Sequence, residues 1–474
     1  MLIGRKEEQE VLKKALDTQE AEMVAVIGRR RVGKTFLVHA VYENHLVFEM
    51  TGIQNGSLRQ QLLNFTDQLS EFAKPRLPLK QPEHWLEAFQ MLRAYLKDLP
   101  DTKKKVIFFD ELPWIATHKS GFLDALGYFW NSWASRQSLV LVICGSAASW
   151  MIQKVVNNRG GLHNRITKRI FLQPFTLFET EQYFSSRDIR FNRYQIVQVY
   201  MAMGGIPHYL KEIEPGKSAI QNINKICFSS SGLLKDEFLR LYPSLFANAG
   251  MHFSVIRALG ERPQGLTRKE LLHASKLPNG GGVTKVLEEL MHSGFISAFK
   301  NFGKKSKEKI YRITDEYSLF YLKFIENMEH EGPDIWNHLS QTQAYISWSG
   351  YAFESICLKH IPQIKKALDI AGIYSVSSAF YQPPSGENPG FQIDLLIDRK
   401  DQVINLFEIK FYNKELSISR EYAAALQQKI NAFANLSKTK KQLFLVMITA
   451  FGVKPNENSL GLVDQVMVMD ELFR

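Results

Sequence analysis

The sequence predicts a multidomain α/β protein, in which short buried strands alternate with helices near the N-terminus and again near the C-terminus. Its 474 residues exceed what one ordinary core accommodates and fit about two to four domains. Three apolar, β-rich runs, at 23–27, 106–109 and 139–144, are separated by helical stretches. Continuous apolar runs of this length are typical of buried parallel strands, and their alternation with helices favours a doubly wound sheet.

The composition indicates a globular protein rather than a disordered one, with 45% hydrophobic and 23% charged residues. The formal charge of +11 favours anionic partners such as nucleotides or nucleic acid. The sequence shows no apolar run of membrane-spanning length and no signal-peptide pattern, so we expect a cytoplasmic protein without a membrane partner. Cys144, Cys227 and Cys357 lie far apart, which predicts neither a zinc site nor a disulfide framework.

A phosphate-binding loop follows the first predicted strand. Residues 28–35, GRRRVGKT, fit the pattern G-x-x-x-x-G-K-S/T between a strand and a helix. The glycines allow successive backbone N–H groups to turn toward phosphates, and the helix N-terminus adds partial positive charge. Lys34 is expected to reach the β- and γ-phosphates of ATP, and Thr35 is expected to ligate Mg²⁺. The predicted nucleotide-binding residues here are Gly28, Arg29, Arg30, Arg31, Val32, Gly33, Lys34, Thr35 and Phe36.

The second and third strands bring polar residues to the same edge. Asp110 and Glu111 follow the apolar run VIFF, which predicts that Asp110 holds Mg²⁺ through water and that Glu111 polarises the attacking water. Ser146 ends the next strand, in ICGS, where a polar side chain would contact the γ-phosphate or the water. The alternative for Ser146 is an ordinary serine in a strand-end turn.

These motifs together resemble the archaeal-type ATPase family, a clade of AAA+/STAND P-loop ATPases. The resemblance rests on IGRKE at 3–7, GRRRVGKT, FFDELPW, ICGSAASWM and GGIPHYL at 204–210, and it covers about residues 1–325. It implies a helical lid in which Pro207 approaches the adenine, with Gly4 and Arg5 also near the base. It further implies that Arg165, in GGLHNRI, is a trans-acting arginine finger of a homo-oligomer. Asn164 departs from the family's usual Gly-Arg pairing, so a solvated arginine unrelated to phosphate is the alternative.

A winged helix is predicted between the lid and the C-terminal region. Helical patterns, including 266–272 and 283–291, precede a hairpin with strands at 295–299 and 310–313. Basic residues on these elements favour contact with duplex DNA phosphates. They are Arg268, Lys269, Lys285, Lys300, Lys304, Lys305, Lys307 and Lys309. The alternatives are a domain that packs on the nucleotide domain and reports its state, or a merely soluble lysine-rich loop.

A carboxylate cluster is predicted near the C-terminal end. Asp394, in QIDLLIDR, and Glu408 with Lys410, in INLFEIKFY, lie on two β-rich runs joined by a polar turn, as in a hairpin. Alternation along a strand places Glu408 and Lys410 on one face. Carboxylates of Asp394 and Glu408 suit one or two Mg²⁺ ions, and Lys410 suits activation of water or stabilisation of a phosphate.

This pattern, after a helix that carries Glu354, resembles the PD-(D/E)XK nuclease superfamily over about 345–474. The resemblance implies a restriction-endonuclease-like α/β domain that cleaves DNA with Glu354, Asp394, Glu408 and Lys410. Gln428 or Lys429 would be a later accessory residue. The alternative is a structural or inactivated fold that keeps these residues as a salt-bridged group.

The sequence thus predicts an Mg²⁺-dependent ATPase coupled to DNA binding and metal-dependent DNA cleavage. The alternative is an ATP-driven molecular switch, or a DNA translocase, whose C-terminal domain binds a partner or nucleic acid without cleaving. The predicted catalytic residues are Glu111, Ser146, Arg165, Glu354, Asp394, Glu408 and Lys410, and the predicted metal ligands are Thr35, Asp110, Asp394 and Glu408. The predicted domains are a P-loop α/β core at 1–170, a helical lid at 171–240, a winged helix at 241–325 and a nuclease-like domain at 326–474.

Overall fold

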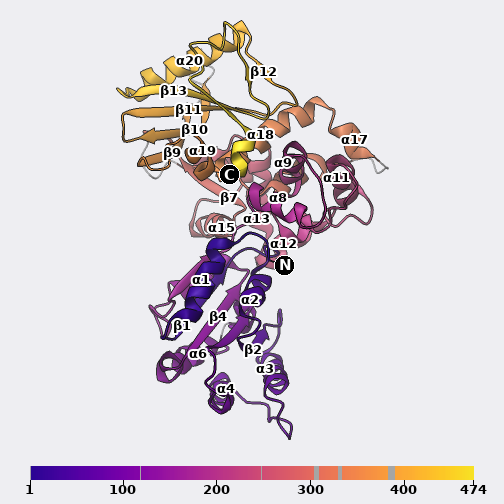
Figure 1. The fold of residues 1–474 in the computed structure, drawn as a ribbon, viewed down its shortest axis with the longest axis vertical. Helices are drawn as coiled ribbons and strands as arrows, with labels where there is room; N and C mark the ends of the chain where they lie inside the picture. The colour runs from indigo at the N-terminus through magenta and orange to yellow at the C-terminus, as the bar shows by residue number, and fades with distance from the viewer. Residues whose placement is uncertain (1, 118, 247, 304–308, 329–333, 383–389) are drawn as a thin grey trace. The chain divides into compact units, whose positions relative to one another are not determined.

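The chain divides into two compact units, Met1–Pro174 and Phe175–Arg474 (Figure 1). The computed structural model describes residues 2–117, 119–246, 248–303, 309–328, 334–382 and 390–474. Lys304, Lys305 and Lys307 of the predicted basic hairpin lie outside these ranges. Within them, no helix has both the length and the apolar character that crossing a membrane requires. The three cysteines are buried free thiols.

A parallel sheet forms the centre of the first unit. In its described residues, five strands pair in the order β2-β3-β4-β1-β5. The three predicted strands correspond to β1, β3 and β4, which are almost wholly buried. Because β4 lies between β1 and β3, the C-terminal ends of these three strands are neighbours. The strands are β1 (Glu22–Ile27), β2 (Leu46–Thr51), β3 (Lys105–Asp110), β4 (Leu139–Gly145) and β5 (Lys168–Phe171).

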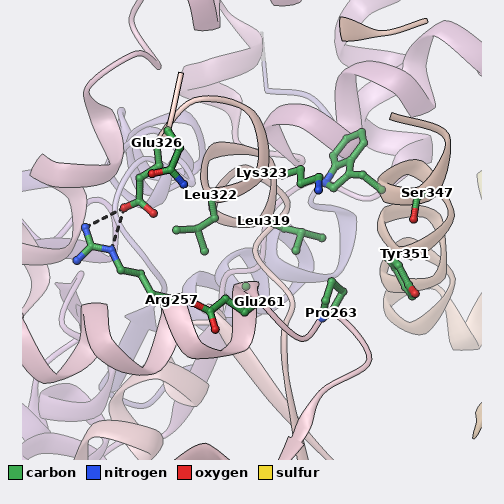
Figure 2. A pocket seen from close by; sticks show the side chains of 12 residues that line it. Arg257, Glu261, Pro263, Leu319, Leu322, Lys323, Glu326, Ser347 and Tyr351 are labelled. Carbon is green, nitrogen blue, oxygen red and sulfur yellow. Dashed lines mark hydrogen bonds and ion pairs between the residues drawn. The ribbon is translucent and has the colours of Figure 1, made fainter. Parts of the chain in front are cut away.

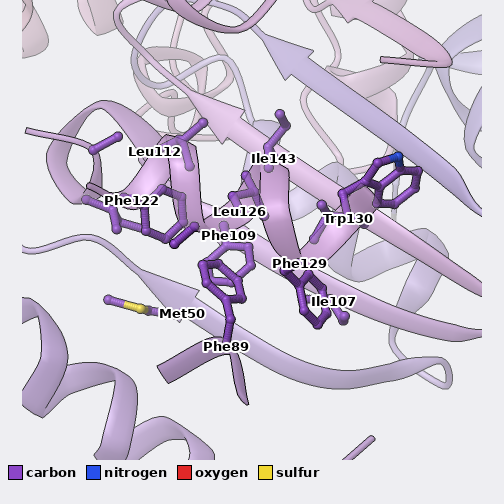
Figure 3. Packing of buried hydrophobic residues seen from close by; sticks show 14 of the residues in the cluster. Met50, Phe89, Ile107, Phe109, Leu112, Phe122, Leu126, Phe129, Trp130 and Ile143 are labelled. Atoms are coloured by element: carbon purple, nitrogen blue, oxygen red, sulfur yellow. The ribbon is translucent and has the colours of Figure 1, made fainter. Parts of the chain in front are cut away.

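Alternating side chains give this sheet two buried faces. On one face, Phe109 of β3 packs against Phe89 and Phe122, with ring centroids 5.9 and 5.5 Å apart (Figure 3). Ile107 and Ile143 extend the same cluster. Burying each large apolar side chain stabilises the fold by about 1.5–3 kcal/mol. The helices on this face are α3 (Leu58–Ala73), α4 (Trp85–Asp98) and α6 (Phe122–Ser132).

The opposite face is covered by α1 (Lys6–Asp17) and α2 (Lys34–Tyr42). His39 of α2 contacts Phe108 of β3 edge to face, and the Tyr42 hydroxyl donates to the Leu12 carbonyl of α1 at 2.7 Å. These contacts fix the helix that opens directly from the predicted phosphate-binding loop. The shorter elements are α5 (Leu112–Ile115), η1 (Ala134–Arg136), α7 (Ala148–Met151) and the π-helical η2 (Ile152–Val156).

The second unit begins with helices that are closed by side-chain caps. Thr176 with Glu179, and Ser218 with Gln221, form capping boxes that satisfy the first backbone N–H groups of two helices. The first helices are α8 (Leu177–Ser185), α9 (Arg193–Met203), α10 (Pro207–Leu210), α11 (Ala219–Phe228) and α12 (Glu237–Leu245). Those that follow residue 315 are α16 (Glu316–Phe324), α17 (Ile335–Leu339), α18 (Gln343–Lys359) and α19 (Ile361–Ala367).

Between α12 and α16, the described residues form α13 (Gly250–Gly260), α14 (Arg268–Ser275), α15 (Gly281–His292) and an antiparallel sheet in the order β6-β8-β7. The strands are β6 (Leu266–Thr267), β7 (Ile296–Lys300) and β8 (Lys309–Ile313). The helix expected at 266–272 begins two residues later, because Leu266 and Thr267 pair with β8 and Thr267 caps the helix.

A sheet of mixed direction carries the predicted carboxylates. In the described residues its order is β15-β13-β11-β10-β9, with antiparallel pairs among β9, β10 and β11 and parallel pairs among β11, β13 and β15. Phe433 of α20 (Arg420–Ser437) packs on Leu396 and Leu406, and Figure 1 shows α20 lying along these strands. Its strands are β9 (Ser375–Gln382), β10 (Phe391–Arg399), β11 (Val403–Lys410), β13 (Gln442–Thr449) and β15 (Gln465–Val468). A separate parallel pair is formed by β12 (Leu416–Ser417) and β14 (Val453–Lys454), and the chain ends with η3 (Met469–Phe473).

Gly205, in the GGIPHYL motif, has no room for a side chain. A Cβ added there would lie 2.0 Å from the Phe175 carbonyl oxygen, while the Phe175 N–H donates to the Gly205 carbonyl at 2.7 Å. We expect Gly205→Ala to lower the free energy of unfolding of the second unit by about 1–3 kcal/mol or more, because overpacking forces the backbone to shift. Urea unfolding followed by circular dichroism measures this change.

Gly350→Ala is the matched control, because nothing lies within 4 Å of a Cβ built at this position inside α18. Alanine in a helix interior is favoured over glycine by about 0.5–1 kcal/mol, so this variant should be neutral or slightly stabilised. Equal free energies of unfolding for Gly205→Ala and Gly350→Ala would show that the backbone at Gly205 accommodates a methyl group without loss of stability.

Candidate nucleotide site and carboxylate cluster

The predicted phosphate-binding loop connects β1 directly to α2. Arg31 and Gly33 have φ values of 72° and 92°, in the left-handed region, and Gly33 is the N-cap of α2. A Cβ on Gly28 would lie 2.5 Å from the Leu172 carbonyl oxygen, so the start of the loop passes close to the chain after β5. Gly28 therefore allows the close approach of two backbones, and Gly33 allows the turn into the helix.

The lysine and the threonine of this loop face polar partners within the first unit. Lys34 is 5% exposed, and its Nζ donates to the Arg29 carbonyl at 3.2 Å. The Thr35 hydroxyl donates to Asp110 Oδ2 at 2.6 Å, which joins α2 to the end of β3. Burial raises the pKa of the Asp110 carboxyl above its ordinary value, and the hydrogen bond from Thr35 opposes that rise.

Glu111 is held by Ser146, the residue that directly follows β4. Its Oε2 accepts from the Ser146 N–H at 3.0 Å and from the Ser146 hydroxyl at 2.7 Å. Its own N–H donates to Asp110 Oδ1 at 2.9 Å, and its backbone is left-handed, with φ 47° and ψ 51°. Ser146, itself 3% exposed, thus orients the carboxylate of Glu111.

Other predicted nucleotide contacts surround the loop. The Arg5 guanidinium reaches the Val32 carbonyl at 3.4 Å, and Gly4 precedes it with φ 62°. Arg30 lies over the Trp114 ring, 5.8 Å from its centroid, and Phe36 is 54% exposed on the first turn of α2. The structure therefore brings Arg5 to the loop. The contact of any of these residues with a base or phosphate stays a prediction.

Two further residues, Arg165 and Pro207, were predicted to contact the nucleotide. Arg165 is exposed in a turn in which its N–H donates to the Leu162 carbonyl at 3.1 Å. Pro207 is in the second unit, where it begins α10. The roles of both residues in nucleotide contact stay predictions.

The hydroxyl of Thr35 and the buried carboxylate of Asp110 are the oxygen ligands that Mg²⁺ prefers in nucleotide sites. They already face each other at hydrogen-bond distance, beside a lysine and a helix N-terminus suited to phosphates. The residues present therefore fit a Mg²⁺–nucleotide complex.

In the second unit, the predicted carboxylate Asp394 accepts hydrogen bonds from two side chains. Its Oδ1 lies 2.6 Å from Nη2 of Arg312, on β8, and 2.8 Å from Nε2 of Gln392. Arg312 is 5% exposed, and its Nε donates to the Gln264 carbonyl at 2.6 Å. The arginine therefore ties the small β6-β8-β7 sheet to strand β10 of the mixed sheet.

Glu408 is surrounded by donors from two elements. Its carboxylate accepts from Lys410 Nζ at 3.0 Å, Lys429 Nζ at 2.7 Å and the Tyr422 hydroxyl at 3.0 Å. Burial pushes the pKa of Glu408 upward, but the attraction of Lys410 and Lys429 outweighs it, and the pKa lies below its ordinary value. For Lys410, the attraction of Glu408 overcomes burial and raises the pKa above its ordinary value.

Glu354, on α18, belongs to the same electrostatic group. Burial raises the pKa of Glu354 well above its ordinary value, and the Asp394 carboxylate raises it further, whereas Arg312 and Lys410 oppose the rise. The four predicted nuclease residues are thus close enough to influence one another. Gln428, the other accessory candidate, is exposed on α20.

This cluster suits a metal less directly than the first site does. Mg²⁺ is usually held by one or two carboxylates together with waters, so Asp394 and Glu408 are suitable donors. In the described residues, however, no three acidic, histidine or cysteine side chains gather into a metal site. One oxygen of Asp394 and both oxygens of Glu408 accept from cationic side chains, so the arrangement is not preformed for a metal.

Sequence reasoning missed three members of this cluster: Arg312, Gln392 and Tyr422. Tyr422 and Lys429 are seven residues apart on α20, and that spacing places both on one helix face. Gln392 is two residues from Asp394 on the same strand, so its side chain points to the same side. Arg312 carried no such signal, because the contact joins segments that are 82 residues apart.

Comparison with known proteins supports the interpretation of the first unit. Residues 2–213 match the family described as an ATPase domain predominantly from Archaea. An uncharacterized protein of Methanocaldococcus jannaschii is 22% identical over 375 residues, which cover 77% of this chain and 78% of that protein.

Among solved structures, a Walker-type ATPase of Pyrococcus abyssi has a TM-score of 0.50 at 16% identity, covering 68% of this chain and 96% of that one. The ORC2 protein of Aeropyrum pernix has a TM-score of 0.42 at 14% identity, covering 68% and 93%, and a likeness at that level carries no argument. The family match supports a P-loop domain of the ATPase type that binds ATP, and the likeness to the Pyrococcus structure supports the fold alone. This support does not extend to DNA binding or to a nuclease.

Proposed function

We propose that the first unit binds ATP with Mg²⁺ and hydrolyses it. The observation that carries the proposal is the convergence of the P-loop, the β3 acids and the β4 serine. Thr35 bonds to Asp110 at 2.6 Å, and Ser146 bonds to Glu111 at 2.7 Å. Hydrolysis of a phosphoanhydride needs a phosphate cradle, a metal site and a base for water, and these residues supply all three.

Each side chain has a distinct task in this proposal. Lys34 leaves the Arg29 carbonyl and binds the β- and γ-phosphates, while backbone N–H groups of the loop donate hydrogen bonds to the other phosphate oxygens. Thr35, and Asp110 through water, would hold Mg²⁺, which would neutralise charge on the phosphate oxygens. Glu111 orients and polarises the attacking water, and Ser146 keeps the Glu111 carboxylate in place.

The proposal also covers recognition of the adenine base and assembly into a homo-oligomer. Gly4 and Arg5 are proposed to approach the base, because Arg5 already contacts the loop at Val32. Pro207 is proposed to contact the base from the lid. The exposure of Arg165 suits an arginine finger that acts on the nucleotide of a second copy in a homo-oligomer.

For the second unit, we infer a DNA-binding winged helix at 241–325. Its support is the order of three helices followed by a β-hairpin, with Lys285 66% exposed on α15 and Lys269 exposed on α14. Such a helix and hairpin place cations along a duplex backbone. Arg268 also bonds to Asn279 and Thr284, so it holds the helices together as well.

We further propose that the C-terminal domain, 326–474, cleaves DNA with Glu354, Asp394, Glu408 and Lys410. The supporting observation is that these four groups, from α18, β10 and β11, influence one another electrostatically. Lys410 is the residue best placed to orient water or to neutralise the phosphate, because Glu408 keeps it protonated. The bound metal would supply charge neutralisation at the scissile phosphate.

Lys410→Ala tests this assignment. We expect the variant to lose plasmid nicking by about 100-fold or more in Mg²⁺ or Mn²⁺, because a general acid–base or charge-stabilising group contributes about that much. Nicking is measured on supercoiled plasmid, with and without ATP. Lys441→Ala is the control, since Lys441 forms an ion pair with Asp398 on the same sheet, away from the cluster. Equal nicking by wild type and Lys410→Ala would eliminate the assignment.

One observation favours a second candidate function, a nucleotide-driven switch or translocase whose C-terminal domain binds a partner or nucleic acid without cleaving. Glu408 already has three donors, which is how a salt-bridged structural group is built. If wild-type protein hydrolyses ATP and binds DNA but never nicks it in Mg²⁺ or Mn²⁺, this second candidate replaces the cleaving enzyme.

A further inference from the structure

Arg312 is the cationic side chain that contacts Asp394. Its guanidinium lies 2.6 Å from Asp394 Oδ1, and Gln392 donates to the same oxygen at 2.8 Å. Arg312 and Gln392 both also donate to the Gln264 carbonyl, at 2.6 and 3.3 Å. The four groups form a closed network that links the loop before β6, strand β8 and strand β10.

The charge of this network opposes metal binding as it stands. Arg312 is 5% exposed, so water screens its positive charge poorly, and a divalent cation at Asp394 would meet strong repulsion. The oxygen nearest to Arg312 already accepts two hydrogen bonds, which leaves it little capacity for a metal. A metal that binds this oxygen must displace the guanidinium, and a metal at the other carboxylate oxygen is still repelled by the charge of Arg312.

An open cleft gives access to this network. A cleft of about 850 Å³ in the second unit has Arg257, Lys323 and Trp348 among its lining residues (Figure 2). Three of its lining residues, Pro263, Leu319 and Tyr351, also line a small cavity that includes Arg312 and Glu354. Solvent and ions in the cleft thus come within a few side chains of the Arg312–Asp394 pair.

We propose that Arg312 is a built-in latch, which keeps Asp394 from binding metal until β8 moves. The proposal rests on the cleavage function proposed above, because Asp394 is the metal ligand in that function. Arg312 lies on the segment proposed to contact DNA, so a shift of that segment on DNA would withdraw the guanidinium. DNA cleavage would then depend on DNA binding, and Asp394 would not bind metal in the DNA-free protein.

Mn²⁺ binding to the full-length protein tests the latch without any assay of cleavage. We expect Arg312→Gln to bind Mn²⁺ about tenfold or more tightly than wild type, since groups next to a metal site change its affinity by that order. The measurement is the loss of the free Mn²⁺ signal in electron paramagnetic resonance. Lys441→Gln, which removes the ion pair with Asp398 on the same sheet, should leave the affinity unchanged.

Asp394→Asn tests whether Asp394 is the residue that binds the metal, and Arg312→Met provides a second variant in case Arg312→Gln is poorly folded. Adding Asp394→Asn to Arg312→Gln should remove the gained affinity. Arg312→Met keeps the length of the apolar stem, and it carries the same expectation if Arg312→Gln shows a lowered unfolding temperature.

Unchanged Mn²⁺ affinity in a folded Arg312 variant overturns the latch, whether or not the protein nicks DNA. Slower nicking at unchanged metal affinity also overturns it, because Arg312 would then be a substrate-binding residue. Tighter Mn²⁺ binding that depends on Asp394 supports the latch. If nicking is then absent from every variant, the latch stands and the cleavage function alone is lost.

Discussion

Lys34→Ala is expected to abolish ATP binding, with a dissociation constant raised about 100-fold or more. Lys34 is 5% exposed at the start of α2, so its ammonium group meets the phosphates in a poorly screened environment. Removing one partner of a buried charged pair costs about 2–5 kcal/mol, which corresponds to this loss of affinity. Titration of a fluorescent ATP analogue against purified protein measures it.

Lys14→Ala is the matched control, because Lys14 is exposed in the last turn of α1. It removes the same charge from the same unit and should bind ATP as wild type does. Wild-type affinity for ATP in a folded Lys34→Ala protein would mean that the loop does not bind the triphosphate. The function proposed for the first unit would then be wrong.

Glu111→Gln is expected to bind ATP normally and to hydrolyse it about 100-fold more slowly, or slower still. Glutamine keeps the shape of the side chain, and its carbonyl oxygen accepts the hydrogen bonds that Ser146 donates to Glu111. It lacks the negative charge that polarises water, and general base catalysis contributes about 10²–10⁴-fold. Phosphate release under saturating ATP, beside the nucleotide titration, separates the two effects.

Glu71→Gln, on the exposed side of α3, is the control for the loss of one negative charge. Its rate of phosphate release should match wild type. Unchanged release in Glu111→Gln would contradict the role of Glu111 as base and would move that role to another group.

The sequence was sufficient to predict the strands that carry the nucleotide site. β1, β3 and β4 are central strands buried on both faces, so they read as continuous apolar runs. β2 lies at the sheet edge with a mixed burial pattern, and its LVFEMT sequence gives no comparable run. The hydrogen bonds Thr35–Asp110 and Ser146–Glu111 follow from strand order, which the alternation of strands and helices alone does not determine.

The carboxylate cluster was predictable only along each strand. The antiparallel pairing of β10 with β11 agrees with the hairpin expected from the polar turn between them. Local alternation also places Glu408 and Lys410 on one face, where they form an ion pair. The contact of Arg312 with Asp394 depends instead on how the β6-β8-β7 sheet packs against β10, and no periodicity in either segment encodes it.

The left-handed backbone of Glu111 has a consequence for how the first unit tolerates sequence change. A non-glycine residue in this conformation costs roughly 1–2 kcal/mol, which neighbouring interactions must offset. Glycine would relieve the cost, yet it would remove the carboxylate that the conformation presents. Glycine would also leave the buried N–H and hydroxyl of Ser146 without this acceptor, at a cost of about 1–3 kcal/mol, so the fold gains little from losing the glutamate.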